Sequence, residues 1–425
     1  MVDIGQRMYD WAVDLFPINR SLTGNGVRET LQYFKKIIPE LEINEVASGT
    51  KCFDWTIPNE WNCKEAYIID PKGNKICDFS VNNLHLMGYS ININQEMKYE
   101  ELIEHLYYLK EQPNAIPYIT SYYKERWGFC ISYEEFQLLE KGIYQVVIDS
   151  ELKEGFLTYG EVILKGTLDK EIFLSTYVCH PSMGNNELSG PVVTTALIEY
   201  IKSIKDRRYT YRIAFIPETI GSICYLSRNI EKMKKNIIAG FNLTTIGDDR
   251  AYSYIPTRYG NTLSDKVAKH ILKDIDYVHY TFLDRGSDER QYCAPHVDLP
   301  IATICRTKYG RYPEYHTSLD NLDLISSDGL FGGYDKLQKS IELLEKNKFY
   351  SIDNFCEPQL GKRGLYPTIS TKQTREIVRV MMDFIAYADG TNDLIDIATI
   401  INVSAYELYE IVEKLESANL IKEIE

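Results

Sequence analysis

Two histidines and one glutamate stand at positions where metalloenzymes keep their ligands. His180 ends the apolar run EIFLSTYVCHP, Glu218 closes the run RIAFIPETIGS, and His316 lies in RYPEYHTSLDNLD. Each stands where we predict a buried strand to give way to a loop, which is where open α/β sheets place their binding crevices. Imidazole and carboxylate are zinc ligands, and a free carboxylate beside the metal can act as general base. Each residue alone is compatible with an ordinary loop position, but together they predict a zinc hydrolase.

The elements that must position these residues alternate along the middle of the chain. Apolar strand-like runs and amphipathic helical runs follow one another from about residue 142 to residue 346. A helix is expected from Ser189, because Pro191 then falls in its first turn. Cys179 adjoins His180, but strand alternation directs its side chain to the opposite face, so we assign it to the core. The pattern predicts an α/β fold with a mainly parallel mixed sheet flanked by helices.

A chain of 425 residues is too long for one ordinary core, so two or three domains are expected. We assign residues 1–48 and 141–350 to the α/β domain that carries the chemistry. Residues 49–140 read as short strands separated by tight turns, and we predict an inserted β-rich domain without a catalytic constellation. Residues 351–425 have the order helix, turn, helix and short wing, which predicts a winged-helix-like domain.

The charge of the chain argues against nucleic acid and anionic membranes as partners. The net charge is −14, and residues 371–425 contain five Lys and Arg against eleven Asp and Glu. The would-be recognition helix carries only Lys414 as a cation, whereas a DNA reader needs several cations to meet phosphates. We therefore interpret the C-terminal domain as a docking or oligomerisation element, compatible with a homo-oligomer.

The cysteines and the first residues indicate the compartment. Nine cysteines are dispersed with no CxxC pair, which is typical of reduced, buried thiols. The start, MVDIGQRMYDWAVDLF, lacks the basic and apolar segments of a signal peptide. No apolar run reaches the roughly 18 residues of a membrane span. A cytoplasmic protein is expected.

Four segments carry a resemblance to a known group of enzymes. CHPSMGNNELSG before a helix, PETIGS, SDERQYCAP and EYHTSLDNLD resemble the zinc aminopeptidase and glutaminyl cyclase superfamily. The similarity covers about residues 142–345 and the N-terminal helices. With its insert and its C-terminal winged helix, the chain looks like a bacterial branch of aminopeptidase-like proteins often associated with surface-polysaccharide genes.

The resemblance implies a set of roles. The family holds two zincs bridged by an aspartate, with one glutamate as base and another as ligand. His180 matches the first histidine ligand, His316 the last, and Glu218 the general base. Ser189 and Gly190 match the Ser-Gly that opens the helix after the bridging loop.

Three family carboxylates are replaced by neutral side chains. The bridging aspartate position is Asn186, the second glutamate is Thr219, and the later strand aspartate is Thr244. Two zincs about 3.5–4 Å apart depend on carboxylates to offset their repulsion. We therefore predict one zinc ion, held by His180, His316 and the amide oxygen of Asn186, with Glu218 as catalytic base or ligand. Glu187, or the pair Asp248 and Asp249, could restore a missing carboxylate, and a degenerate site is the other outcome.

The rest of the pocket is assigned to substrate. We predict Asp288, Arg306 and Tyr315 as substrate-binding residues. Asp288 could alternatively cap a helix. Arg306, which lies near Tyr309, could bind a substrate carboxylate or pair with Glu314.

The sequence therefore predicts a zinc-dependent, aminopeptidase-like hydrolase of amide bonds. Its substrate would be a peptide N-terminus or an N-acyl group on a small molecule such as an amino sugar of a surface-polysaccharide precursor. Zinc would polarise the carbonyl and acidify water while Glu218 moves the proton. The alternative is a binding or assembly protein that keeps the fold without turnover.

Overall fold

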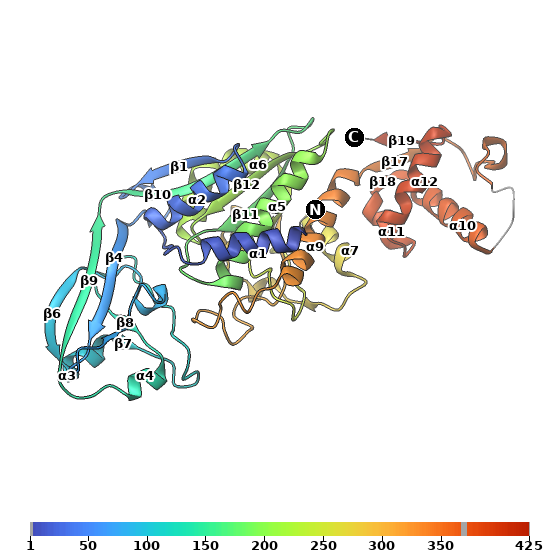
Figure 1. Ribbon diagram of the computed structural model, residues 1–425. Helices are drawn as coiled ribbons and strands as arrows, with labels where there is room; N and C mark the ends of the chain where they lie inside the picture. Colours follow the sequence, from blue (N-terminus) through green and yellow to red (C-terminus); the bar gives the residue numbers. More distant parts are fainter. Residues whose placement is uncertain (1–2, 367–371, 425) are drawn as a thin grey trace. The chain divides into compact units, whose positions relative to one another are not determined.

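The computed structural model describes residues 3–366 and 372–424 (Figure 1). The chain divides into two compact units, which are described one at a time. The larger unit comprises Met1–Ser264 and Asp276–Leu337, and the smaller unit comprises Asp265–Ile275 and Gln338–Glu425.

The larger unit is built on an eight-stranded mixed sheet in the order β1-β10-β12-β11-β13-β16-β14-β15. Its centre is parallel, because β11 pairs in parallel with β12 and β13, and β13 with β16. Every residue of β11 and β12 is buried, as expected for strands covered on both faces. The strands are β1 (Glu42–Ala47), β10 (Phe156–Leu164), β11 (Glu171–Tyr177), β12 (Thr210–Ile216), β13 (Ile237–Asn242), β14 (Ser253–Ile255), β15 (Val278–His279) and β16 (Ile301–Cys305).

Helices cover both faces of this sheet. Helices α1 (Ile4–Leu15), α2 (Asn25–Ile37) and α5 (Ser189–Ser203) lie on one face, and α6 (Ile220–Asn236) lies on the other (Figure 1). Phe34 of α2 packs on Phe215, with ring centroids 5.4 Å apart, whereas Tyr225 of α6 stacks on Phe173. Strand alternation turns Phe215 and Phe173 to opposite faces. The fold predicted from the sequence, an α/β sheet flanked by helices, is confirmed.

The larger unit also contains α8 (Glu289–Tyr292) and the first part of α9 (Ser327–Lys346), whose second part belongs to the smaller unit. Helix α7 (Leu263–Leu272) belongs almost entirely to the smaller unit. Helix α5 begins at Ser189, as the position of Pro191 predicted. Helix α6 begins at Ile220, immediately after Glu218 and Thr219, so the candidate base lies at the junction between β12 and α6.

The insert forms its own four-stranded antiparallel sheet in the order β5-β4-β9-β6. Strand β9 pairs with β4 along nearly its whole length and with β6 on its other side. Residues from 141 onward were predicted to belong to the large sheet, but β9 belongs to the sheet of the insert. The elements are β2 (Lys51–Cys52), β3 (Trp55–Thr56), β4 (Glu60–Ile69), β5 (Lys75–Ile76), β6 (Ile93–Lys98), α3 (Tyr99–Leu102), β7 (Leu106–Tyr107), β8 (Phe129–Cys130), α4 (Tyr133–Gln137) and β9 (Ile143–Lys153).

The smaller unit contains a winged helix. Helices α11 (Leu394–Ile400) and α12 (Ala405–Ser417) form the helix-turn-helix, preceded by α10 (Lys372–Tyr387). A three-stranded sheet joins them in the order β18-β17-β19, made of β17 (Phe349–Ile352), β18 (Asp389–Asp393) and β19 (Ile421–Ile424). Among the described residues, no helix is both long and apolar enough to cross a membrane.

Candidate metal and catalytic site

The three residues that opened the sequence analysis come together at the carboxyl edge of the large sheet. Strands β11 and β12 are parallel neighbours, with Tyr177 opposite Ile216, so the loops that follow them begin side by side. His180 Nε2 consequently lies 3.8 Å from Glu218 Oε2. The His180 and His316 rings have centroids 5.5 Å apart, because the loop after β16 returns to the same edge.

Backbone strain gathers at this edge. Ser182, Thr219, Thr245 and His316 all have positive φ, at 24°, 64°, 44° and 58°. Such conformations are costly for residues with a side chain, and they persist only where the surroundings impose them. All four lie in loops that follow strands of the large sheet, which singles out this edge as a candidate functional region.

A buried carboxylate orients His180. Glu187 Oε2 accepts hydrogen bonds from the His180 backbone N–H at 3.0 Å and lies 3.1 Å from Nδ1 of the ring. The Arg20 Nε atom is 3.2 Å from Glu187 Oε1, and both side chains are fully buried. An Nδ1–H held by a carboxylate is the usual arrangement behind a metal-binding histidine, whose Nε2 becomes a ligand once it has lost its proton.

Arg20 also contacts the backbone beside the site. It belongs to the turn-rich stretch PINRSLTGNG and donates to the backbone oxygens of His180 and Leu15. Its guanidinium is therefore part of the wall behind the site. Glu187, considered above as a replacement ligand, is engaged on both oxygens by His180 and Arg20.

The charges of the two reactive groups depend on one another. Burial acts to lower the pKa of His180, but contact with Cys179 and Glu187 outweighs it, so the pKa lies well above the ordinary value. Burial raises the pKa of the Glu218 carboxyl, against the opposing charge of His180. A carboxylate with a raised pKa is a stronger base, which suits proton abstraction near neutral pH.

His316 has an unused nitrogen. Its Nε2 is buried and forms no hydrogen bond, which is unusual for a polar atom withdrawn from water. Tyr315 stacks on the ring at a centroid distance of 3.9 Å. Burial, together with the charge of His180, lowers the pKa of His316 to about 3, so the ring is a neutral lone-pair donor. An orphaned imidazole nitrogen is what a ligand position requires.

The insert supplies a residue that the sequence analysis missed. The ring of Tyr118 lies 5.3 Å from that of His180 and 5.2 Å from that of His316. Its backbone N–H donates to the His316 carbonyl at 2.9 Å. Tyr118 is separated from both histidines by many residues and stands in no recognisable motif, so the sequence carried no signal for it.

The three neutral residues that replace family carboxylates, Asn186, Thr219 and Thr244, form hydrogen bonds with other residues of the protein. The Tyr177 hydroxyl donates to Asn186 Oδ1 at 3.1 Å and lies 2.6 Å from Thr244 Oγ1. Thr219 heads helix α6 and donates its backbone N–H to Asp288. None of the three replaced positions offers a negative charge, so the donor set does not fit a pair of zinc ions.

Two members of the donor set lie at a spacing that suits one ion. Two ligands of a tetrahedral zinc, with bonds of about 2.0–2.2 Å, lie about 3.4 Å apart, close to the 3.8 Å between His180 Nε2 and Glu218 Oε2. The donor atoms of His180, Glu218 and His316 do not all lie within 4.8 Å of one another, so His316 would have to move closer to become the third ligand. Asn186 was predicted as a further ligand, but its amide oxygen already accepts from Tyr177.

A different trio has the tightest grouping of donor atoms. Among the described residues, only Cys179, His180 and Glu187 have His, Cys, Asp or Glu donors all within 4.8 Å of one another. The buried Arg20 guanidinium beside Glu187 would repel a cation there. Burial also raises the pKa of the Cys179 thiol to about 11. The Cys179 sulfur lies 3.4 Å from His180 Nδ1, so the prediction that this side chain points away from His180 was wrong. We therefore interpret this trio as the support of His180 and not as the metal site.

Asp288 lies next to the site but caps a helix. Its Oδ1 accepts from the Thr219 N–H at 2.8 Å and from the Ser222 hydroxyl at 2.7 Å, at the start of α6. Oδ2 is buried without a partner. Burial, with the nearby charge of Glu218, raises the pKa of Asp288 to about 7. Asp288 therefore caps a helix, as one of the two sequence-based hypotheses expected, but the helix is α6 and not the helix that follows Asp288.

Arg306 does not form the ion pair considered for it. Its guanidinium lies over the ring of Tyr252, 4.0 Å from the centroid, and only 7% of the residue is exposed. Glu314 pairs instead with Arg250 through two hydrogen bonds. Tyr309 donates to Glu289 and is buried. Of the three predicted substrate-binding residues, Tyr315 alone has a described contact with either histidine.

The acidic residues after β13 do not complete the site. Asp248 accepts from Asn185, from the backbone of Arg250 and from the backbone and hydroxyl of Thr307. Asp249 is exposed and accepts from Ser326. Both carboxylates serve loop structure, so neither replaces a missing ligand.

Asp320 organises the segment that carries Asn186. Its carboxylate accepts the backbone N–H groups of Asn185, at 2.6 Å, and Asn186, at 3.0 Å. The Tyr312 hydroxyl donates to the same group at 2.8 Å. Burial raises the pKa of Asp320 to about 6. The sequence placed Asp320 in the motif EYHTSLDNLD but gave no indication of this role.

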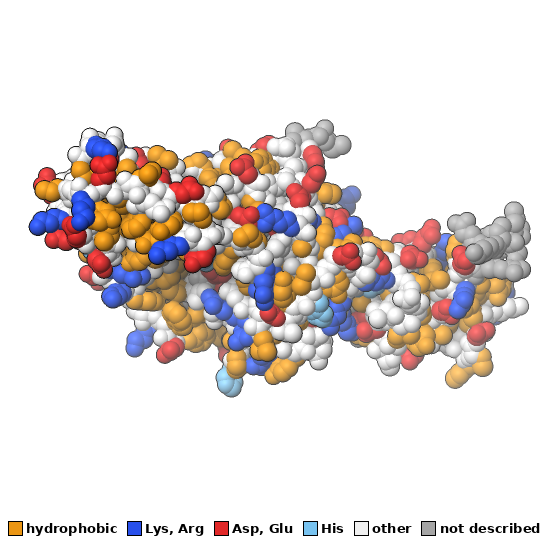
Figure 2. Space-filling view, turned by 90° about the horizontal axis from the view of Figure 1, so that it is seen from below, with side chains coloured by type: hydrophobic (Ala, Val, Ile, Leu, Met, Phe, Trp, Pro, Cys, Tyr) orange, Lys and Arg blue, Asp and Glu red, His pale blue; other side chains and the backbone are white. Residues whose placement is uncertain are grey.

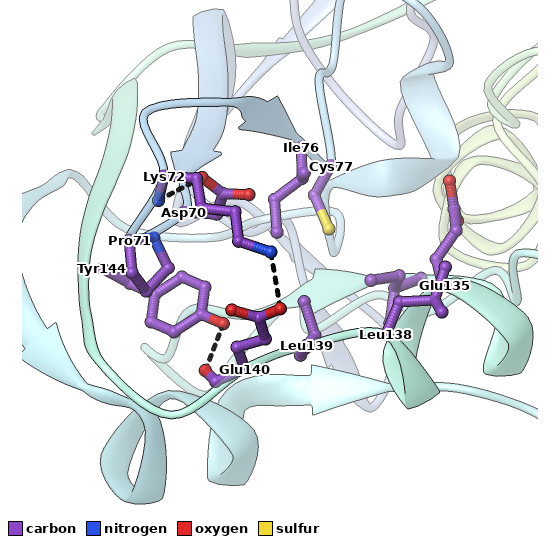
Figure 3. Close-up of a pocket in the computed structure, with 11 residues that line it drawn as sticks. Asp70, Pro71, Lys72, Ile76, Cys77, Glu135, Leu138, Leu139, Glu140 and Tyr144 are labelled. Carbon is purple, nitrogen blue, oxygen red and sulfur yellow. Dashed lines mark hydrogen bonds and ion pairs between the residues drawn. The ribbon is translucent and has the colours of Figure 1, made fainter.

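A cavity inside the insert has no comparable chemistry. It measures about 170 Å³, and its lining includes Cys77, Leu138 and Leu139 (Figure 3). Figure 3 shows the Lys72 ammonium bridging to Glu140 across it. Both members of that pair are largely exposed, so it is an ordinary surface ion pair.

Comparison with known families assigns the chain. Residues 9–347 match the family described as "Domain of unknown function (DUF4910)". The chain belongs to this family. Residues 348–423 match a family described as winged helix-turn-helix, which confirms the predicted C-terminal fold.

Similar proteins agree with this assignment. A Clostridium acetobutylicum protein named "Putative polysaccharide biosynthesis protein with aminopeptidase-like domain" is 44% identical over 400 residues, covering 93% of this chain and 91% of that protein. The crystal structure of a "putative peptidase" from the same species is 42% identical, with a TM-score of 0.93, and covers 99% and 96% of the two chains.

The core fold is that of zinc aminopeptidases. The zinc aminopeptidase of Bacillus subtilis superposes with a TM-score of 0.58 at 13% identity, covering 80% of this chain and 95% of that one. The resemblance noted from the sequence is thereby confirmed for the fold.

Proposed function

We propose that this protein hydrolyses amide bonds with the help of one metal ion, with Glu218 as the general base. The observation that carries the proposal is the pairing of His180 Nε2 with Glu218 at 3.8 Å, beside the orphaned Nε2 of His316. A buried carboxylate and a buried guanidinium stand behind His180 to fix it. Protein interiors rarely hold unpaired polar atoms without a reason.

The chemistry divides between the ion and the chain. A bound zinc ion, held by His180 and His316, supplies Lewis acidity toward a carbonyl oxygen and lowers the pKa of water. Glu218 takes a proton from water at Oε2 and returns it to the leaving nitrogen. Glu187 keeps His180 in one tautomer throughout. The aromatic rings of Tyr118 and Tyr315 limit access of bulk water to the two histidines.

The substrate carries an amide whose acyl side is small. Two sources remain open: a peptide N-terminus, as in aminopeptidases, and an N-acyl group on an amino sugar. The name of the Clostridium acetobutylicum relative, which refers to polysaccharide biosynthesis, favours the second source. The neutral side chain of Thr219, where the related fold has a carboxylate, gives a peptide ammonium group less to bind.

A binding protein without turnover is the second candidate. The hydrogen bonds that join Tyr177 to Asn186 and Thr244 favour it, because they occupy the place of a catalytic ion with neutral groups. Such a protein would keep the pocket and bind a similar ligand.

Replacement of Glu218 separates the two candidates. Zinc-loaded Glu218→Gln should fold normally and lose about 10²–10⁴ in rate on aminoacyl amides or N-acetyl amino sugars. The measurement is product release across a panel of both amide classes, with bound zinc quantified by elemental analysis. Glu96→Gln, at an exposed position of β6, is the matched control and should retain the wild-type rate.

The outcomes are distinct. A wild type that binds one zinc but is as inert as Glu218→Gln on every amide would favour the binding protein. If the Glu218→Gln variant has full activity, the protein is still a hydrolase but Glu218 is not its general base.

A further inference from the structure

We propose that Tyr118, contributed by the insert, is a specificity-determining residue that restricts the site to substrates with a small acyl group. The inference deepens the proposed function and rests on it. Its geometry is a triangle of rings, in which Tyr118 lies 5.3 Å from His180 and 5.2 Å from His316, while the two imidazoles are 5.5 Å apart. The phenol ring therefore covers one side of the gap between the two candidate ligands.

A ladder of hydrogen bonds fixes this ring in place. Pro117 and Thr317 form an antiparallel bridge, and the Tyr118 N–H donates to the His316 carbonyl. Ile116 and Ser318 exchange two hydrogen bonds, from Ile116 N–H to Ser318 Oγ at 3.0 Å and from Ser318 N–H to the Ile116 carbonyl at 2.9 Å. These hydrogen bonds hold the backbone of Tyr118 beside the His316 loop, so the residue cannot move away from the site without breaking them.

The ladder extends beyond Tyr118. Gln112 Nε2 donates to the Pro313 carbonyl at 2.6 Å, so residues 112–118 run along residues 313–318. The loop that carries His316 and the strap that carries Tyr118 are thus one paired structure. These contacts join the insert directly to the loop that carries His316.

The site has little free space on its other sides. The Tyr177 ring lies 5.3 Å from that of His180, and Tyr315 stacks on His316 at 3.9 Å. Only 5% of the His180 side chain and 18% of the Glu218 side chain are exposed. An acyl substituent that passes the two histidines on this side meets the Tyr118 ring, so a large substituent would clash.

The Tyr118 ring presents an aromatic face beside the two histidines. A methyl or other small acyl group can pack against such a face, whereas a charged substituent gains no ionic partner from it.

Binding of two metal-chelating probes to the zinc-loaded full chain tests the proposal. Acetohydroxamate carries a methyl group and benzohydroxamate carries a phenyl group on the same chelating head. Wild type should bind acetohydroxamate more tightly. Tyr118→Ala should reverse this preference by about tenfold or more, because removing the ring opens the acyl side. Isothermal titration calorimetry gives both affinities.

Two variants guard against loss of fold as an explanation. Tyr118→Phe keeps the ring and should keep the wild-type preference. Tyr123 lies five residues after Tyr118, is 57% exposed and donates its hydroxyl to the Thr56 carbonyl. Tyr123→Phe should also leave the preference unchanged. Bound zinc is measured for each, so that a lost ion is not mistaken for lost selectivity.

The results separate this proposal from the proposed function. If the wild type discriminates between the probes through Tyr118 but hydrolyses no amide, the specificity role of Tyr118 is supported and the proposed hydrolase activity is rejected. A zinc-loaded wild type that binds both probes equally, or a Tyr118→Ala variant with an unchanged preference, would overturn the role of Tyr118, whereas a wild type that takes up no zinc would overturn the proposed function.

Discussion

Asn186, Thr219 and Thr244 decide how many ions the site can hold. A second cation beside the first needs negative charge to offset repulsion. Here Asn186 Oδ1 and Thr244 Oγ1 both bond to the neutral Tyr177 hydroxyl, and the pKa of that phenol is raised well above its ordinary value by burial. The phenol therefore cannot supply the missing charge as phenolate.

Asn186→Asp should raise the affinity for a second ion. The substitution is nearly isosteric and introduces a carboxylate at the bridging position, next to a Tyr177 hydroxyl that can donate to it. A zinc titration against a competing chromophoric chelator should move from one equivalent toward two. Asn94→Asp, at an exposed position of β6, adds the same charge elsewhere and should leave the titration unchanged. If Asn186→Asp also stays at one equivalent, Thr219 and Thr244 are the limiting replacements.

At this scale the sequence predicted which candidate residues lie together better than it predicted the residues that support them. His180 and Glu218 could be recognised because each directly follows an apolar strand, and parallel neighbouring strands bring their ends together. Arg20 and Tyr118 could not be recognised, because each reaches the site from a distant loop whose path depends on tertiary packing. The roles expected of Asn186 and Arg306 differ from their contacts, since both side chains find nearby partners that spacing does not reveal.

Among the elements, the strand that joins insert to core was the hardest to assign. The run QVVIDS in β9 is as apolar as the strands of the large sheet, so its texture could not distinguish the two sheets. Pairing with β4 places β9 in the sheet of the insert, and the residues of β9 alone do not reveal which distant strand they pair with. The helix-turn-helix of α11 and α12 was easier, because its period and its turn are local signals.

The junction between α7 and α12 should respond to acid. The Ala405 N–H, at the start of α12, donates to His270 Nε2 at 2.9 Å. Burial, reinforced by Lys273, lowers the pKa of His270 to about 4, against about 6.5 in an unfolded chain. Between these values the unfolded state binds more protons, so the stability of this unit falls as the pH drops from about 6.5 to about 4.

Hydrogen exchange can follow this loss at α12. Relative to intrinsic rates, the amides of residues 405–417 should be less protected at pH 5 than at pH 7. His270→Gln, which cannot titrate, should show much less difference between the two pH values. His279→Gln, at an exposed position of β15, should behave like wild type. Equal protection at both pH values in wild type would contradict the role given to His270.

Across the whole molecule, negative charge is the dominant property. The net charge is −14. On the face seen in Figure 2, Lys and Arg side chains are interspersed with Asp and Glu, and the described residues form no continuous basic surface there. Helix α12 has the place of a recognition helix, but its lone cation, Lys414, lies 3.6 Å from Glu410. Ile377 and Ile400 are exposed in this unit, and docking of this domain to another protein stays a prediction.

The full chain should therefore fail to bind DNA despite its winged helix. Binding to a duplex draws on counterions released by Lys and Arg, and an acidic surface releases few while repelling the phosphates. At about 0.1 M salt, micromolar protein should not retard a random duplex in a mobility-shift assay. Replacing Glu410 and Glu413 with Lys gives a matched variant whose α12 is basic, and this variant should begin to retard the duplex at low salt. Retardation by wild type that weakens steeply with salt would show that cations outside α12 form a binding surface, and the docking interpretation of this domain would then be wrong.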